Sequence, residues 1–199
     1  MLKTRKKVSD EYRATSAPRL VEVPTTKYLS ITGRGAPGGP AFTDAMNALY
    51  AVAYTIKMAR KKVGTQFKIA KLEGLWWGDH PGAVVPDSPE EWNWQLLIRV
   101  PEAVTNGEVA AAAKLLRERG KSAMVDSVVI AELEEGQCVQ AMHIGPYANE
   151  KETIKRMQAY AADKGMKFSG RHHEIYIGDP RRAAPERLRT ILRMPVAQN

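Results

Sequence analysis

The chain has 199 residues, of which 44% are hydrophobic and 26% charged, and its formal net charge is +8. This length is enough for one globular domain with a sizeable core, and no apolar run approaches the roughly 20 residues needed to cross a bilayer. The single cysteine, Cys138, excludes an intramolecular disulfide framework. The charged N-terminus is not followed by the apolar segment of a secretory signal, so the sequence predicts a cytoplasmic protein.

The positive charge raises nucleic acid as a partner. However, the basic residues are scattered in short runs at the ends of elements or in loops, at 5–7, 59–62, 117–121 and 181–182. No zinc-finger or RNA-recognition signature accompanies them. We therefore expect a solvated basic surface, with neither a nucleic acid nor a membrane as partner.

Hydrophobic periodicity and turn residues predict a regular succession of strands and helices. In chain order we expect a strand at 27–32, a helix at 42–61, strands at 67–77 and 92–100, a helix at 109–119, strands at 124–133 and 137–143, a helix at 149–163, and strands at 171–177 and 190–195. The strands on either side of Glu135 and Gly136 are expected to form a hairpin. Gly165 is expected to end the last helix.

The order of these elements repeats along the chain. Each half contains a strand, a Gly/Pro turn, a helix, a strand, a loop and a strand. "WWGDHP" at 76–81 parallels "YIGDPR" at 176–181, and "LLIRVP" at 96–101 parallels "TILRMP" at 190–195. The repeat predicts an α+β fold in which two β-α-β-β modules form an antiparallel sheet, with the helices on one face and a ligand groove between the modules.

The predicted organisation is a basic N-terminal segment at 1–20 followed by a single domain at 21–199. Within the domain we expect module one at 27–101, a bridge at 102–136 and module two at 137–196.

One glutamate in a strand-like run, Glu174 in "HHEIYI", is costly to bury and easily replaced by an apolar residue. Aligning the two Gly-Asp pairs places Gly74 opposite Glu174 and Trp76 opposite Tyr176. Because side chains alternate along a strand, His172, Glu174 and Tyr176 share a face. Glycine at position 74 could leave room beside Glu174. The structural alternative is an ion pair between Glu174 and an arginine.

Aromatic residues are expected to line the same groove. Trp76 and Trp94 are the strongest candidates for contact with a flat ligand, and Tyr50 and Tyr176 are further candidates. For each of these residues the alternative is ordinary core packing. Tyr50 and Tyr54 lie four residues apart and form a helical stripe that could equally pack on the sheet.

The sequence predicts neither a metal site nor a cofactor. His172 and His173 are neighbours in a strand, so they point to opposite faces, and His143 is isolated. The glycine-rich "GRGAPGG" at 33–39 lacks the ending of a phosphate loop and the register of a dinucleotide fold. The partner of Glu174 in an ion pair, if it has one, is expected to be Arg171 or Arg193.

Four segments together resemble the GyrI-like small-molecule-binding family, and in particular its stand-alone members. They are "ALYAVAYTIKM" (48–58), "EGLWW" (73–77), "CVQAMHIGPYANE" (138–150) and "HHEIYIGDPRR…PERLRTILRMPV" (172–196). The resemblance extends over nearly the whole chain from about Val21. It implies two β-α-β-β modules, a ligand groove between them and a functional glutamate at the position of Glu174.

The resemblance also implies a small aromatic or cationic molecule as partner. Some stand-alone members are implied to hydrolyse cyclopropanoid genotoxins, and in that reaction Glu174 would activate water while Tyr54 stabilises the developing oxyanion. His172 and Gly74 would complete the ligand site. Two alternatives stay open: a non-catalytic module that sequesters drugs, and a protein-binding regulator such as a gyrase inhibitor.

Overall fold

The computed structural model describes residues 11–79, 88–179 and 182–198. The chain divides into two compact units. Residues 26–133 form what we call the central unit, and residues 1–25 with 134–199 form the C-terminal unit. Most of the predicted bridge, as far as Leu133, therefore belongs to the central unit. The boundaries predicted for a single domain and its modules stay predictions.

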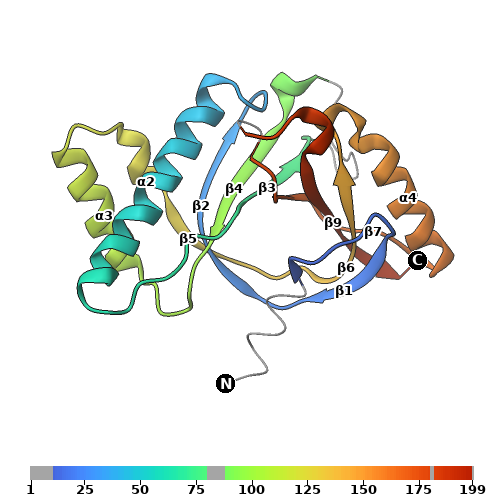
Figure 1. The fold of residues 1–199 in the computed structure, drawn as a ribbon, viewed down its shortest axis with the longest axis horizontal. Coiled ribbons are helices and arrows are strands. Elements are labelled where there is room, and N and C mark those ends of the chain that lie inside the picture. The colour runs from blue at the N-terminus through green and yellow to red at the C-terminus, as the bar shows by residue number, and fades with distance from the viewer. Residues whose placement is uncertain (1–10, 80–87, 180–181, 199) are drawn as a thin grey trace. The chain divides into compact units, whose positions relative to one another are not determined.

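The central unit is an antiparallel sheet with two α-helices (Figure 1). Its elements are β2 (Thr26–Arg34), α2 (Pro40–Lys62), β3 (Leu72–Trp77), the 3-10 helix η1 (Pro89–Glu91), β4 (Asn93–Arg99), α3 (Asn106–Glu118), the 3-10 helix η2 (Ala123–Ser127) and β5 (Val129–Leu133). The strand order is β3-β4-β2-β5.

Helix α2 covers one face of this sheet because its small and aliphatic residues recur at three- and four-residue spacing. Its buried positions are Ala45, Ala48, Leu49, Val52, Ala53 and Ile56. They pack in one core with alternate residues of the strands, including Leu29, Ile31, Leu96 and Ile98. Each fully buried aliphatic side chain of this kind stabilises the fold by about 1.5–3 kcal/mol.

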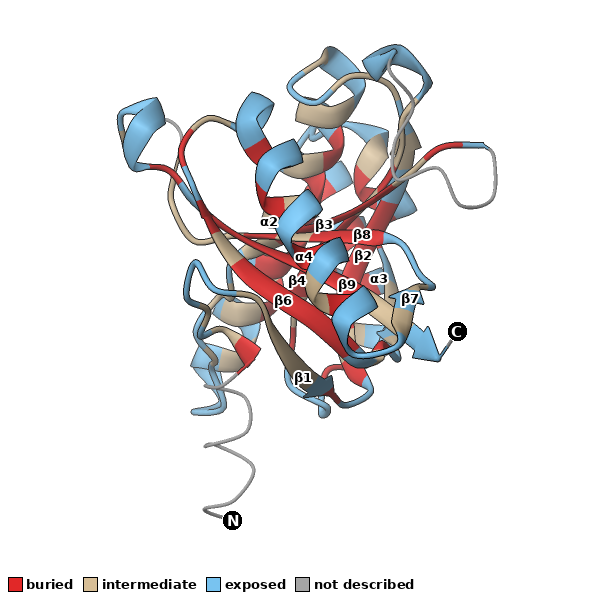
Figure 2. Cartoon of the chain, turned by 90° about the vertical axis from the view of Figure 1, so that its right-hand side faces the viewer, coloured by how far each residue is buried: buried red, intermediate tan, exposed pale blue. Residues whose placement is uncertain are grey.

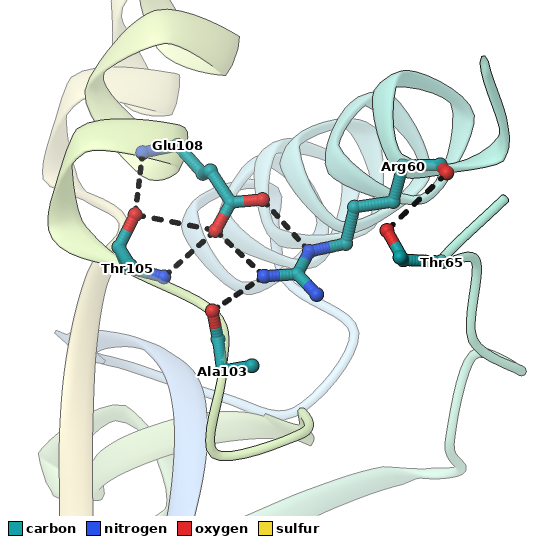
Figure 3. A network of polar contacts seen from close by, with 5 residues as sticks. All are labelled: Arg60, Thr65, Ala103, Thr105 and Glu108. Atoms are coloured by element: carbon teal, nitrogen blue, oxygen red, sulfur yellow. Dashed lines mark hydrogen bonds and ion pairs between the residues drawn. The ribbon is translucent and has the colours of Figure 1, made fainter. Parts of the chain in front are cut away.

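Helix α3 is attached to α2 by a polar network (Figure 3). Thr105 caps α3 in a reciprocal capping box with Glu108, which satisfies backbone N–H groups at the helix start. The Arg60 guanidinium of α2 donates from Nε to Glu108 Oε1 at 2.7 Å and from a terminal nitrogen to Oε2 at 2.9 Å. A terminal nitrogen of the same guanidinium also donates to the Ala103 carbonyl. Glu108 thus serves both as a cap and as the ion-pair partner that holds α3 on α2.

The C-terminal unit is a second antiparallel sheet with one α-helix. Its elements are β1 (Arg19–Val23), β6 (Gly136–Ile144), the 3-10 helix η3 (Tyr147–Asn149), α4 (Glu150–Asp163), β7 (Met166–Phe168), β8 (His172–Tyr176), the 3-10 helix η4 (Pro185–Arg187) and β9 (Arg189–Gln198). The strand order is β1-β6-β9-β8, and β7 pairs with the far end of β9.

Helix α4 covers one face of this sheet, and Figure 2 shows its exposed outer side and the buried strands β6 and β9. Met157 and Ala161 of α4 pack with Val139 and Ala141 of β6. Leu192 and Met194 of β9 complete the cluster. Gly165, with φ +72°, follows the C-cap and ends the helix as the sequence predicts.

The opposite face of the C-terminal sheet carries a buried ionic network. Arg193, 2% exposed, donates to Glu135 Oε2 at 2.8 Å and to Gln140 Oε1 at 2.9 Å. His173 Nδ1 lies 2.9 Å from the other Glu135 oxygen. Arg193 also donates to the backbone carbonyl of Glu11, which fastens the N-terminal segment to this face.

The structure confirms the α+β class, the antiparallel sheet and the repeated β-α-β-β order. Two glycines mark equivalent positions, because Gly35 donates its N–H to the Trp92 carbonyl at 2.8 Å and Gly145 donates its N–H to the Leu188 carbonyl at 3.0 Å. Both glycines have positive φ, +117° and +130°, directly after the first strand of their module. The two turns are therefore equivalent, because in each unit the glycine N–H donates to a carbonyl of the residue just before the last strand of the module.

The strand registers confirm that Gly74 corresponds to Glu174. Gly74 faces Leu96, and Glu174 faces Leu192. Leu96 in turn faces Ile31, four residues before Gly35, and Leu192 faces Ala141, four residues before Gly145. The same registers make Trp76 equivalent to Tyr176 and Trp94 equivalent to Thr190.

The predicted alignment of residues 96–101 with residues 190–195 is displaced by two residues. Aligning "LLIRVP" with "TILRMP" would pair Leu96 with Thr190, whereas the strand pairings put Trp94 there, two residues away. A shift of two residues keeps every side chain on its face, so the hydrophobic pattern alone does not detect the difference.

The hairpin expected around Glu135 and Gly136 is also wrong. β5 pairs with β2, and β6 pairs with β1 and β9. The two strands next to each other in sequence thus belong to different units, and β1 and β2 are divided in the same way. The strands expected at 67–77 and 124–133 are shorter, because β3 begins at Leu72 and residues 123–127 form a 3-10 turn. β1 and the short β7 are not among the strands expected from the sequence.

Candidate functional site

Glu174 lies on the face of the C-terminal sheet that α4 covers. It is the third residue of β8 and faces Leu192, which belongs to the core beneath α4. His172, two residues before it, is buried on the same face, with Nε2 3.2 Å from Glu174 Oε1. The predicted alternation along this strand therefore places His172 and Glu174 together.

A second carboxylic acid, Glu150, lies beside Glu174. Glu150 is the first residue of α4, is 7% exposed and forms a side-chain hydrogen bond with Glu174. Burial raises the pKa of Glu150 far above its usual range, and the charge of Glu174 and the hydrogen bond to it add to the rise. Its surroundings therefore favour the protonated form of Glu150, whose hydroxyl can donate to Glu174. The sequence does not single out Glu150, because a glutamate in the first turn of a helix is ordinarily a solvated favourable charge.

A histidine anchors the chain just before Glu150. His143 Nδ1 lies 3.1 Å from Thr153 Oγ1, and Nε2 lies 3.0 Å from the Pro146 carbonyl. A carbonyl only accepts, so Nε2 carries a proton and donates it to the Pro146 carbonyl. Both contacts fix the turn before α4 to its first turn, and this fixes the position of Glu150.

Two tyrosines border the carboxylate pair. Tyr147 and Tyr176 make an edge-to-face contact with ring centroids 6.1 Å apart. Burial raises the pKa of Tyr147 to about 12, helped by the negative charges of Glu174, Glu150 and Asp179. Tyr147 is thus a protonated phenol near Glu174. Nothing in the sequence pattern singles out this tyrosine, which directly follows Gly145 and Pro146.

The expected alternative of an ion pair between Glu174 and Arg193 is wrong. Arg193 faces His173 across β8 and β9, so its side chain lies on the opposite face from Glu174 and pairs with Glu135. Glu174 Oε1 instead lies 3.2 Å from His172 Nε2, a contact that is an ion pair only when the imidazole is protonated.

Trp76 and Trp94, the predicted ligand walls, lie in the core of the central unit and are 2% and 1% exposed. Phe42 of α2 stacks on Trp76 at 5.7 Å between centroids and meets Trp94 edge-on at 5.6 Å. Trp92 contacts Trp76 edge-on at 5.7 Å. Such burial supports the packing alternative for these two residues.

The other predicted residues of the central unit differ in exposure. Tyr54 is 51% exposed on α2, 6.3 Å from the ring of Tyr50, with Lys57 Nζ 5.7 Å above its ring. Gly74 is buried in β3. These residues belong to one unit and Glu174 to the other, so a joint site with Trp76, Trp94, Tyr50, Tyr54 and Gly74 stays a prediction.

Among the described residues, one group has the donors that a metal ion needs. Glu150, His172 and Glu174 each offer one ligand atom, and these atoms lie within 4.8 Å of one another. Also within the described residues, no helix is long and apolar enough to cross a membrane.

Comparison with known proteins gives a family. The GyrI-like small molecule binding domain matches residues 16–197. No curated protein sequence matches the chain significantly. A crystal structure from Listeria innocua, of an uncharacterised conserved protein, is 33% identical with a TM-score of 0.89, and the match covers 97% of this chain and 98% of the other. Another Listeria innocua structure, of a hydrolase, is 33% identical with a TM-score of 0.86 and the same coverage.

A more distant structure, the EcmrR C-terminal domain, is 12% identical, with a TM-score of 0.60 over 92% of this chain and 98% of that domain. At this identity the likeness concerns the fold alone. Because the family model matches residues 16–197 and the Listeria structure is 33% identical over 97% of the chain, the chain belongs to the GyrI-like small-molecule-binding family.

Proposed function

We propose that this small-molecule-binding protein hydrolyses reactive planar electrophiles of the cyclopropanoid class, with Glu174 as the catalytic base. The observation that carries the proposal is the Glu150–Glu174 pair on the helix-covered face of the C-terminal sheet, next to the apolar core beneath α4. At the equivalent place the central unit has a glycine and a tryptophan cluster, so the fold does not need carboxylates there. Listeria innocua proteins described as hydrolases, 33% and 32% identical, support turnover rather than binding alone.

This reaction needs two groups from the protein: a carboxylate that acts as general base and a hydrogen-bond donor to the carbonyl oxygen. Glu174 takes a proton from water as the water oxygen bonds to a cyclopropane carbon. The ring C–C bond breaks, and its electron pair moves through the conjugated dienone to the carbonyl oxygen, which is then protonated. Positioned general-base catalysis contributes about 100- to 10,000-fold.

The oxyanion donor has two candidates. Tyr54 is the residue expected from the sequence, and its exposed phenol on α2 is free to meet a substrate. Tyr147 lies in the same unit as Glu174, and the charge of Glu174 helps to keep it protonated. Tyr54→Phe and Tyr147→Phe, compared in the same assay, separate the two, and the variant with the larger fall in kcat identifies the donor.

The test is mass spectrometry of a cyclopropanoid compound after incubation with the protein. Turnover adds the mass of one water, whereas unchanged mass with saturable binding identifies a non-catalytic sequestering module. Glu174→Gln should lower hydrolysis at least 100-fold while the fold and the binding of planar ligands survive. Glu152→Gln is the matched control, because Glu152 is exposed in the same first turn of α4.

Full hydrolysis by Glu174→Gln, together with a large fall in melting temperature, would make the catalytic assignment untenable. A pull-down of gyrase by the wild-type chain, with no ligand binding, would instead favour the protein-binding regulator.

A further inference from the structure

Three side chains of the C-terminal unit have the composition of a divalent metal site. Glu150 and Glu174 offer carboxylate oxygens and His172 offers an imidazole nitrogen. Zn²⁺ binds such atoms at about 2.0–2.2 Å, so the ligand atoms of one ion lie at most about 4.4 Å apart. The three ligand atoms here lie within 4.8 Å of one another before any ion is present. Small side-chain rotations are enough to close them around an ion.

Two of these side chains are buried and each has a polar atom without a hydrogen-bond partner among the described residues. Glu150 is 7% exposed, and within the described residues its Oε1 has no hydrogen-bond partner. His172 is 3% exposed, and its Nδ1 likewise has no partner there. A buried polar atom without a partner costs about 1–3 kcal/mol. An ion that takes a lone pair of Glu150 removes one of these costs.

The backbone holds the three donors on regular elements. His172 and Glu174 stand two residues apart in β8, so the strand directs both to one face. Glu150 is held at the start of α4 by the contacts of His143 with Thr153 and Pro146. Ligands on a strand and at a supported helix start keep their spacing better than ligands on loops.

We propose that Glu150, His172 and Glu174 bind one divalent transition-metal ion of the Zn²⁺ or Mn²⁺ kind. One imidazole with two carboxylates suits these ions better than Ca²⁺ or Mg²⁺, which prefer ligand sets made only of oxygens. Three protein ligands leave coordination positions for water or a ligand atom. The ion would compete with any cationic ligand for Glu174, so the metal-bound and metal-free proteins would differ in ligand affinity.

This site goes beyond the proposed hydrolysis and does not depend on it. The experiment uses the full chain, dialysed against EDTA and then freed of chelator. ZnCl₂ and MnCl₂ are titrated separately by calorimetry, and bound metal is counted by elemental mass spectrometry. We expect one equivalent of at least one of these ions and a rise in melting temperature on binding.

The variants Glu150→Gln and His172→Asn should each weaken that binding by at least about tenfold. Glu152→Gln, in the same helical turn but exposed, should bind as the wild type does. Melting temperatures without metal establish that each variant is folded, and if Glu150→Gln is not, His172→Asn decides. Failure of both ions to bind saturably would overturn the proposal, as would binding that neither variant weakens.

The two proposals fail separately because the titration contains no substrate. Loss of hydrolysis in Glu174→Gln bears on the proposed base whatever the metal result. Metal binding that depends on Glu150 and His172 bears on the metal site even when no compound is hydrolysed.

Discussion

The two units use one β-α-β-β module to build two different environments beneath the start of their long helix. In the central unit Phe42, Trp76 and Trp94 fill this position with stacked rings. In the C-terminal unit Glu150 and Glu174 lie under the start of α4. Both helices begin five residues after the marker glycine of their module, so the backbone frame is shared. The backbone is therefore alike in the two units, and a few side chains beneath the start of the helix determine whether this region is hydrophobic core or candidate site.

The sheet faces away from α2 and α4 also differ between the units, because one has an apolar residue where the other has a charged one. Leu97 lies in a small apolar cluster with Tyr28 and Leu75. The equivalent residue of the C-terminal unit is Arg193, because Leu97 faces Ser30 where Arg193 faces Gln140. The C-terminal unit thus carries charge on both faces of its sheet, and the central unit carries apolar packing at both equivalent positions.

The largest expected effect comes from removing the aromatic cluster. Trp76→Ala should cost about 3–5 kcal/mol of unfolding free energy, because a fully buried indole leaves a cavity against Phe42. Tyr176→Ala, at the equivalent half-buried position, should cost about 1 kcal/mol. Urea denaturation of both variants measures the difference. If both variants lose the same unfolding free energy, Tyr176 is as much a part of the core as Trp76, and the contrast between the two positions is wrong.

Arg193→Met tests the charged face. It removes one partner of the buried Glu135 carboxylate and should cost about 3–5 kcal/mol. Leu97→Met, at the equivalent apolar position, should cost less than about 1.5 kcal/mol. Chemical denaturation measures both, and a cost below 1.5 kcal/mol for Arg193→Met as well would mean that the network is not a net stabiliser.

The same network predicts acid sensitivity. Burial acts to raise the pKa of Glu135, but His173 and Arg193 outweigh it and lower this pKa to about 2. Since the folded-state pKa lies below the unfolded value, the contribution is complete above about pH 4.5 and is lost as the pH falls towards 2. The shift corresponds to roughly 3 kcal/mol. Unfolding free energies between pH 5 and 3 should fall more steeply for the wild type than for Glu135→Gln, and parallel curves would contradict this assignment.

Gly33→Ala tests how closely the central unit is packed. A Cβ built at Gly33 would overlap the ring of Trp94, so we expect a loss of about 1–3 kcal/mol. Gly107→Ala is the control, because its nearest contact is an ordinary 3.8 Å from Thr105 Oγ1 and alanine favours the helix. Thermal unfolding compares them, and a neutral Gly33→Ala would mean that Trp94 moves easily, as a ligand-contacting residue could.

The smallest effect concerns α3, which has no counterpart among the described residues of the C-terminal unit. Thr105→Ala removes the helix cap and should cost about 1 kcal/mol. Thr105→Ser keeps the capping oxygen and should cost less. Circular dichroism during urea denaturation reports both, and an unchanged midpoint for Thr105→Ala would indicate that the Arg60–Glu108 ion pair alone fixes the helix start.

The repeat, and the side chains that share a face with Glu174, can be predicted from the sequence alone. Period-two alternation placed His172 with Glu174, and the aligned Gly-Asp pairs matched Gly74 to Glu174, because both inferences use only local geometry. The stop at Gly165 was predictable for the same reason, since a positive φ after a helix is a local demand.

Strand pairing and contacts between distant charges, in contrast, depend on the tertiary structure. β5 and β6 are neighbours in sequence yet pair with different partners, and a two-residue register shift leaves the hydrophobic pattern unchanged. Glu150 stands 24 residues from Glu174, and Glu135 stands 58 residues from Arg193. Whether a glutamate is solvated, shares a proton or joins an ion pair depends on burial and on partners distant in the chain, and these exist only once the sheet has formed.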